Sequence, residues 1–179
     1  MPGIDPARPF RPLNIAVLTV SDSRTLDDDR SGNLLVERLT GAGHHLADRA
    51  LVRDESGLIA AKFRQWIEDS AIDVVISTGG TGVTGRDVTP EALDAVIEKS
   101  IPGFGELFRM ISYQKIGSST VQSRAAAGVA KGTYLFALPG SPGACRDAWD
   151  EILAAQLDIR HRPCNFAELL PRLREHEAS

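Results

Sequence analysis

The stretch "DVVISTGGTGVTGRDVTPEAL" (Asp73–Leu93) decides the fold, because a strand, a glycine-rich loop and a helix start follow one another within it. "DVVIST" is a short, β-branched apolar run, as expected of a strand that is covered on both faces. Four glycines then fall within the seven residues 79–85. Pro90 suits the first position of a helix, and we expect Thr89 to be its N-cap. Strand, loop and helix in succession form the repeating unit of α/β proteins.

The same alternation continues on both sides of this stretch. Short apolar runs predict strands at 14–20, 46–52 and 133–138, in addition to 73–78. Helical spacing or composition predicts helices at 31–43, 56–69 with Ser56 as N-cap, 90–100, 105–116, 124–130 and 144–157. Strands that alternate with helices indicate an α/β fold, in which helices wrap a parallel or mostly parallel sheet.

Length and charge narrow the classes of partner. The chain has 179 residues, which fits one domain, and a formal net charge of −4 without a long block of one sign. This balance argues against nucleic acid as a general partner, so an anionic ligand would be met locally. The first 13 residues lack the apolar core of a signal peptide, and no later run approaches a membrane span. We therefore expect a cytoplasmic protein with no membrane partner.

Ligands of such sheets bind beyond the carboxyl ends of the strands. Four segments occupy those positions: "SDSRTLDDDRSG" from Ser21, "RDES" from Arg53, the glycine-rich loop, and "PGSPG" from Pro139. The candidate ligand-binding residues are Ser21, Asp22, Gly79, Gly80, Thr81, Gly82, Thr89, Pro90, Glu91, Ser112, Gly140, Ser141 and Pro142.

The glycine-rich loop matches two nucleotide-binding patterns in letters but not in context. Gly80 to Gly85 spells GxGxxG, yet Pro90 delays the helix and no strand follows for some forty residues. The ATP-binding phosphate loop would need Lys and Ser or Thr where Arg86 and Asp87 stand. What remains is either a plain turn, which needs only one glycine, or a backbone that a ligand approaches closely. Free N–H groups at the following helix start suit a phosphate or a polar heterocycle edge.

Asp54 and Asp87 are the candidate catalytic acids, because each lies just past a strand and outside any amphipathic stripe. A lone aspartate in a loop is often only a turn residue or a cap. If several carboxylates flank a bound phosphate, like charges about 4 Å apart repel by roughly 4 kcal/mol at an effective dielectric near 20. A divalent cation would then be required, and Mg²⁺ is typically held by one or two carboxylates plus substrate phosphates.

Seven ordered motifs resemble those of a known family: "TVSDS", "DDRSG", "STGGTG", "RDVTPEAL", "PGFGE", "LPGSPGA" and "RPCNF". They are similar to the molybdopterin-binding domain of molybdenum cofactor biosynthesis proteins, and to the protein B branch in particular. The resemblance runs from about Asn14 to Phe166. It implies a three-layer α/β/α sandwich, with 14–158 as the molybdopterin-binding domain and 159–179 as a C-terminal tail. Residues 1–13, which are rich in Pro and Arg, are expected to form a flexible N-terminal arm.

The resemblance also implies an activity, a trimeric or hexameric assembly, and contact with other cofactor biosynthesis proteins. Active relatives join molybdopterin to Mg-ATP, giving adenylated molybdopterin and pyrophosphate. By motif, the loop Gly79–Gly82 resembles the molybdopterin-binding loop, Asp87 the acid at the pterin site, and Asp54 the acid of adenylyl transfer and the Mg²⁺ ligand. Two alternatives stay open: a non-catalytic molybdopterin-binding paralogue, which the tail "RPCNF" favours, and a nucleotide hydrolase on the same domain.

Overall fold

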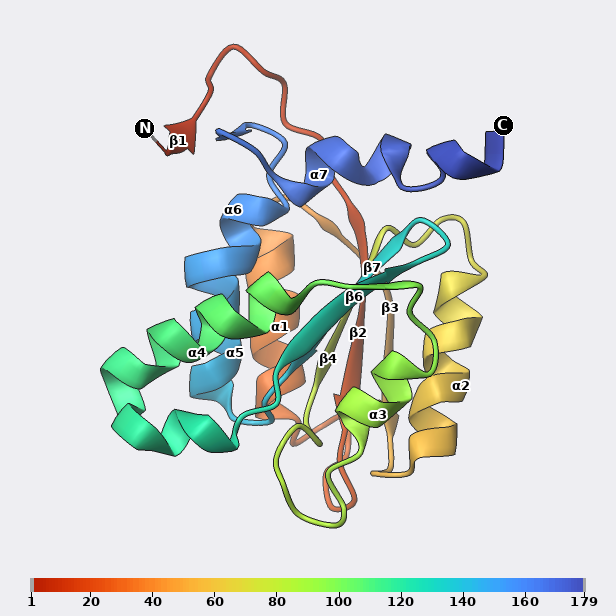
Figure 1. Ribbon diagram of the computed structural model, residues 1–179, viewed down its shortest axis with the longest axis vertical. Coiled ribbons are helices and arrows are strands. Elements are labelled where there is room, and N and C mark those ends of the chain that lie inside the picture. The colour runs from red at the N-terminus through yellow and green to blue at the C-terminus, as the bar shows by residue number, and fades with distance from the viewer. Residues whose placement is uncertain (1, 179) are drawn as a thin grey trace.

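The computed structural model describes residues 2–178, and its centre is a six-stranded sheet of order β3-β2-β4-β7-β6-β5 (Figure 1). The first four of these strands run parallel to one another, β6 pairs antiparallel with β7, and β5 pairs antiparallel with β6. Their bounds are β2 (Asn14–Val20), β3 (His45–Val52), β4 (Val74–Thr78), β5 (Lys99–Ser100), β6 (Ala126–Ala130) and β7 (Thr133–Leu138). The mostly parallel sheet expected from the sequence is confirmed.

Helices cover both faces of the sheet. Neighbouring residues of a strand point to opposite faces, so a strand made of apolar residues has two faces to bury. Ile15 and Val17 of β2 pack into one apolar core, and Ala16 and Leu18 pack into the other. The first core holds α1 (Arg30–Gly41), α4 (Pro102–Ile116), α5 (Pro142–Ala148) and the π-helical segment Trp149–Leu153, which continues into α6 (Ala154–Gln156). The second core holds α2 (Ser56–Ile67) and α3 (Thr89–Asp94). The expected three-layer sandwich is thereby confirmed.

The helix predicted at 124–130 is wrong, because Ala126–Ala130 forms strand β6 between β7 and β5. Alanine favours helices, but the preference is small and sheet pairing overrides it here. Gly128 fixes the close packing of this strand. A Cβ added there would lie 2.7 Å from Ile97 side-chain carbons and 2.8 Å from the carbonyl oxygen of Lys99.

Three helix boundaries also differ from the expected ones. The helix predicted at 90–100 ends at Asp94, since Lys99 and Ser100 pair with β6. Ser56 is the first residue of α2 rather than its N-cap, which is Glu55 without a side-chain cap bond. Thr89 is likewise inside α3, and its hydroxyl donates to the carbonyl of Gly79 at 2.8 Å instead of capping the helix.

The N-terminal arm, which we expect to be loose, lies against the C-terminal tail in the structure. Strand β1 (Gly3–Ile4) pairs antiparallel with β8 (His161–Arg162). Arg8 donates to the carbonyl of Ile159 at 2.8 Å and forms an ion pair with Glu168 at 2.9 Å. The tail continues through α7 (Phe166–Leu169) and the 3₁₀ turns Leu170–Arg172 and Glu175–Ala178. Within residues 2–178, no helix combines the length and apolarity needed to cross a membrane.

Candidate functional site

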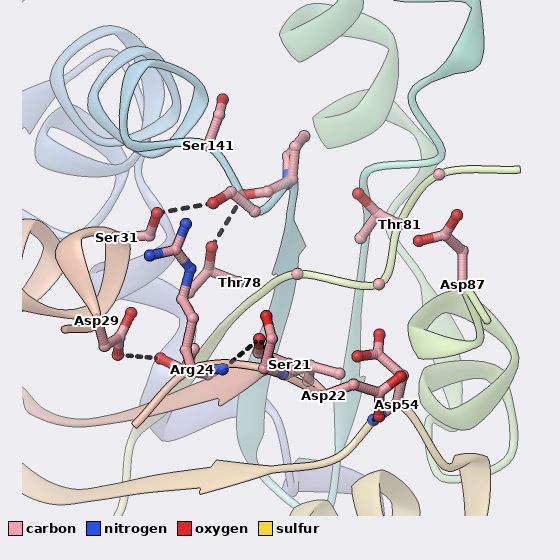
Figure 2. Close-up of a pocket in the computed structure, with 18 of the residues that line it drawn as sticks. Ser21, Asp22, Arg24, Asp29, Ser31, Asp54, Thr78, Thr81, Asp87 and Ser141 are labelled. Atoms are coloured by element: carbon pink, nitrogen blue, oxygen red, sulfur yellow. Dashed lines mark hydrogen bonds between the residues drawn. The ribbon is translucent and has the colours of Figure 1, made fainter. Parts of the chain in front are cut away.

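The loops that follow β2, β3, β4 and β7 meet around one cavity of about 590 Å³ at the carboxyl ends of the parallel strands (Figure 2). These are the four segments that the sequence analysis selected. The cavity is lined by ten of the predicted residues: Ser21, Asp22, Asp54, Gly79, Gly80, Thr81, Gly82, Asp87, Gly140 and Ser141. Because the parallel strands end at the same edge of the sheet, residues that lie far apart in the sequence meet at this cavity.

Five predicted ligand-binding residues do not line this cavity: Thr89, Pro90, Glu91, Ser112 and Pro142. Thr89 and Pro90 are buried at the start of α3, and Ser112 is buried on α4. Pro142 is the first residue of α5, whose N-cap is Ser141. The Ser141 side chain accepts a hydrogen bond from the backbone N–H of Ala144 at 3.2 Å.

Close packing accounts for three of the four loop glycines. Gly79 and Gly80 have φ angles of +105° and +68°, which side-chain-bearing residues rarely adopt. A Cβ at Gly79 would lie 2.1 Å from the carbonyl oxygen of Val20, and one at Gly80 would lie 2.4 Å from Oγ1 of Thr89. A Cβ at Gly82 would lie 2.7 Å from a carboxylate oxygen of Asp87, whereas nothing lies within 4 Å at Gly85. The glycine-rich loop therefore packs directly against Asp87, one of the two candidate catalytic acids.

Arg124, which the sequence analysis missed, holds this loop in place. Its Nε donates to the carbonyl of Gly82 at 2.7 Å, and one terminal nitrogen donates to the carbonyl of Asp87 at 2.8 Å. The guanidinium also pairs with the carboxylate of Glu91. Glu91 therefore has a structural partner, which explains why it does not face the cavity. Arg124 is the first residue of the segment predicted as a helix at 124–130, and nothing in that local pattern indicated this contact.

Asp87 is held as an ionised acid at the edge of the cavity. Partial burial raises its pKa, but hydrogen bonds from Thr84 and the backbone of Gly82 outweigh that effect, so the pKa is lowered overall. One carboxylate oxygen accepts from the backbone N–H and the hydroxyl of Thr84 at 2.8 and 2.7 Å. This oxygen is fixed by the protein, and the carboxylate is oriented for contact with a ligand.

Asp54 has the opposite electrostatic environment. Its pKa is raised, first by partial burial and then by the negative charge of Asp22. Asp22 itself forms an ion pair with Arg86 at 2.9 Å, and the bond from Arg86 lowers the pKa of Asp22. No described residue donates a hydrogen bond to the Asp54 carboxylate or pairs with it. The charge of Arg86 offsets these effects only in part, and the Asp54 carboxylate has no hydrogen-bonded partner among the described residues.

Asp29 also lines the cavity, but its carboxylate is used to stabilise the fold. It is fully buried, caps α1 by accepting from the N–H of Gly32 at 2.9 Å, and pairs with Arg49 at 3.0 Å. Thr19 donates at 2.5 Å to the carboxylate oxygen that also pairs with Arg49. The cap explains why an acid precedes "RSG" in the sequence.

The structure adds further lining residues that the sequence analysis did not select: Thr19, Val20, Ser23, Arg24, Ser31, Thr78, Gln122, Ser123 and Pro139. Ser31 joins two of the loops, because its hydroxyl donates to the carbonyl of Gly140 at 2.7 Å. Gln122 ends a 3₁₀ segment (Gly117–Gln122) after α4 and reaches the cavity from outside the strand-end loops. Arg24 and Ser31 do lie within a selected segment, so position alone could have indicated them.

Comparison with known protein families identifies the domain that carries this cavity. Residues 16–159 match the family described as "Probable molybdopterin binding domain". The chain belongs to this family, and the resemblance noted from its motifs is confirmed.

Within the family, the similarity is to molybdenum cofactor biosynthesis protein B. The protein of that name from Escherichia coli K12 is 51% identical over 157 residues, which cover 88% of this chain and 92% of the relative. A crystal structure of molybdenum cofactor biosynthesis protein B superposes with a TM-score of 0.83 at 38% identity, covering 92% and 98% of the two chains. The tungsten cofactor synthesizing protein MoaB from Pyrococcus furiosus gives a TM-score of 0.75 at 32% identity, with the same coverage.

Proposed function

We propose that this chain acts in molybdenum cofactor biosynthesis by binding molybdopterin in the strand-end cavity and adenylylating it with Mg-ATP. The observation that carries the proposal is the meeting of the glycine-rich loop, Asp54 and Asp87 around one cavity within a molybdopterin-binding domain. A purely structural loop would not need two acids beside it, one with a raised pKa and the other with a lowered pKa.

The binding half of the proposal rests on the loop and Asp87. Residues Gly79–Gly82 line the cavity, where a flat ring system can approach their backbone, and Arg124 fixes the loop conformation before a ligand arrives. The ionised Asp87 carboxylate can accept hydrogen bonds from the N–H groups of a pterin edge. A preorganised loop lowers the entropy cost of binding.

The residues around Asp54 fit a magnesium ion that is completed by substrate. Within the described part of the chain, no group of three or more His, Cys, Asp or Glu residues could hold a metal alone. Mg²⁺ commonly needs only one or two carboxylates, because waters and substrate phosphates supply the remaining ligands. The oxygens of the Asp54 carboxylate accept no hydrogen bond from a described residue, and the nearby carboxylates of Asp22 and Asp87 add negative charge, so Asp54 would hold the ion. Bound there, Mg²⁺ would neutralise charge on the polyphosphate of ATP.

The proposed reaction needs placement more than it needs reactive side chains. A phosphate oxygen of molybdopterin forms a bond to the α-phosphorus of ATP, and the bond from that phosphorus to the bridging oxygen breaks. Pyrophosphate leaves with the electron pair of that bond, so no protein nucleophile is consumed. The loop backbone and Asp87 hold the pterin, and Asp54 holds the metal-bound nucleotide, so that the reacting atoms meet in line.

The second candidate is a non-catalytic molybdopterin-binding subunit of the same pathway. It is favoured by the "RPCNF" tail, which the resemblance associates with paralogues of decayed acid motif. Both acids are present in this chain and both line the cavity, which favours the enzyme.

We also propose that the chain forms a homo-oligomer, a trimer or hexamer. Exposed apolar side chains recur at every third residue along α4, and one more lies in the segment after it: Leu107, Met110, Tyr113, Ile116 and Val121, with exposed fractions of 41–79%. A cluster of this kind on a water-facing helix is typical of a protein interface. Other proteins of the cofactor pathway are further partners that the family membership supports.

Separating the roles of the two acids tests the proposed function. Asp54→Ala should retain molybdopterin binding but lose adenylyl transfer by about 10²–10³-fold, as is common when electrostatic support for a transition state is removed. Asp87→Ala should instead weaken molybdopterin binding. Binding would be measured by calorimetry and transfer by release of pyrophosphate. If both variants lost binding equally, or if Asp54→Ala retained full transfer, the assignment of roles would be wrong.

A further inference from the structure

Arg24 is the only cationic side chain among the described residues that line the cavity. A short turn presents it, in which the Ser21 hydroxyl oxygen accepts from the backbone N–H groups of Ser23 and Arg24 at 3.3 and 3.2 Å. One guanidinium nitrogen of Arg24 donates to the carbonyl of Asp28 at 3.2 Å, which steadies the side chain. The other guanidinium N–H groups have no partner in the described part of the chain.

Arg24 differs from the neighbouring arginines because it has no carboxylate within ion-pair distance. Arg49, Arg86 and Arg124 each bond a residue that lines the cavity, and each is paired with an acid. Their charges are therefore compensated within the protein. The charge of Arg24 is not paired in this way, although it lowers the pKa of nearby Asp28, after the hydrogen bonds from Thr25. An exposed, unpaired guanidinium at a cavity is available to an anionic ligand.

Hydroxyl groups with free protons lie on the same side of the cavity as Arg24. The oxygens of Ser21 and Ser141 accept backbone hydrogen bonds, and neither hydroxyl donates to a described residue. In Figure 2 the Arg24 side chain extends into the cavity toward Ser31 and Thr78, whereas Asp54 and Asp87 lie on the opposite side. The acidic side of the cavity is therefore the one that holds Asp54 and Asp87. The other side offers a cation with hydroxyl donors, and the acid that lies there, Asp29, is paired with Arg49.

We infer that Arg24 binds a phosphate group of the ligand, with Ser21 and Ser141 as additional donors. This inference deepens the proposed function and rests on it for the identity of the ligand. The guanidinium fork suits two oxygens of one phosphate, and the distance from the acidic side spares that phosphate repulsion by Asp54 and Asp87. The phosphate belongs either to molybdopterin or to the chain of ATP, and both offer the same oxygen acceptors.

The test compares Arg24→Gln and Arg24→Lys with Arg30→Gln as a matched control. Arg30 is exposed at the first position of α1, forms no ion pair with a described residue and does not line the cavity. Calorimetry would measure the binding of molybdopterin, of the same pterin after phosphatase treatment, of ATP and of inorganic pyrophosphate. Circular dichroism would confirm that each variant is folded.

Arg24→Gln should bind the phosphate-bearing ligand about 10- to 100-fold more weakly than wild type, as expected for loss of a charged hydrogen bond. Arg24→Lys should lose less, Arg30→Gln should match wild type, and binding of the phosphatase-treated pterin should not depend on Arg24. A loss confined to molybdopterin would assign the phosphate to the pterin, and a loss confined to ATP would assign it to the nucleotide.

Folded Arg24→Gln that binds every phosphate ligand as wild type does would overturn the inference and leave the proposed function intact. Wild type that binds pyrophosphate through Arg24 but ignores molybdopterin would support the inference and overturn the proposed function. Wild type that binds none of these ligands would overturn both.

Discussion

Replacing Gly80 by alanine should destabilise the fold and disturb the cavity, and the structure gives the size of the effect. Gly80 has a φ of +68°, and a residue with a Cβ in that region costs about 1–2 kcal/mol. The new Cβ would also lie 2.4 Å from Oγ1 of Thr89, which donates to the carbonyl of Gly79. Moving Thr89 away would sacrifice that hydrogen bond, at about 0.5–1.5 kcal/mol. Together these effects predict a loss of about 2–3 kcal/mol.

The measurement is thermal unfolding followed by circular dichroism, combined with calorimetric binding of molybdopterin. For a domain of this size, about 2–3 kcal/mol corresponds to a Tm lower by roughly 5–10 °C. Gly85→Ala is the matched control, because it lies in the same loop and its added Cβ meets nothing within 4 Å. We expect Gly80→Ala, and more strongly Gly80→Val, to lose molybdopterin binding in a chain that still folds. Equal Tm values and equal affinities for the two alanine variants would refute this reasoning.

The pH dependence of stability and the state of assembly provide further tests. Since the folded-state pKa of Asp54 is raised, the wild type binds more protons when folded and loses stability as pH rises through that pKa. Asp54→Asn should therefore be more stable than wild type at pH 7, with an advantage that shrinks on acidification; an advantage independent of pH would contradict the burial and charge argument. Light scattering at micromolar concentration should show three or six copies of the chain. Met110→Glu should reduce that number, because Met110 is 67% exposed among the exposed apolar side chains of α4. A stable wild-type monomer would contradict the proposed assembly.

The arrangement of the site could be predicted because it depends on strand ends. Apolar runs such as "NIAVLTV" and "TYLFAL" identify buried strands locally, and parallel strands place the loops that follow them at one edge. Asp22 and Asp54 are far apart in the sequence, yet the backbone N–H of Asp54 donates to Asp22 at 3.2 Å. Their proximity follows from the parallel pairing of β2 with β3.

Features that depend on contacts between distant segments could not be predicted in this way. "RAAAGVA" has the composition of a helix, and only its position between β7 and β5 makes it a strand. Thr89 has the sequence position of an N-cap, but its hydroxyl donates to the carbonyl of Gly79 instead of capping the helix. Arg124 reaches Gly82 across 42 sequence positions. In each case a tertiary contact outweighs a local preference.

Arg24 could not be identified as a ligand-binding residue for a different reason. Its segment was selected correctly, but its charge is surrounded in sequence by Asp22, Asp27 and Asp28, which suggests local pairing. The structure pairs Asp22 with Arg86 instead and binds the Asp28 carboxylate to Thr25. The sequence could not show which of these neighbours would leave the arginine unpaired.

The most direct test of the proposed enzyme is to incubate the wild-type protein with molybdopterin, ATP and Mg²⁺ and to measure both products. The account predicts adenylated molybdopterin and pyrophosphate in equal amounts, dependent on Mg²⁺ and formed about 10²–10³-fold more slowly by Asp54→Ala. If saturating ATP yields neither product while calorimetry shows tight molybdopterin binding, the enzyme is contradicted and the chain is a binding subunit of the pathway.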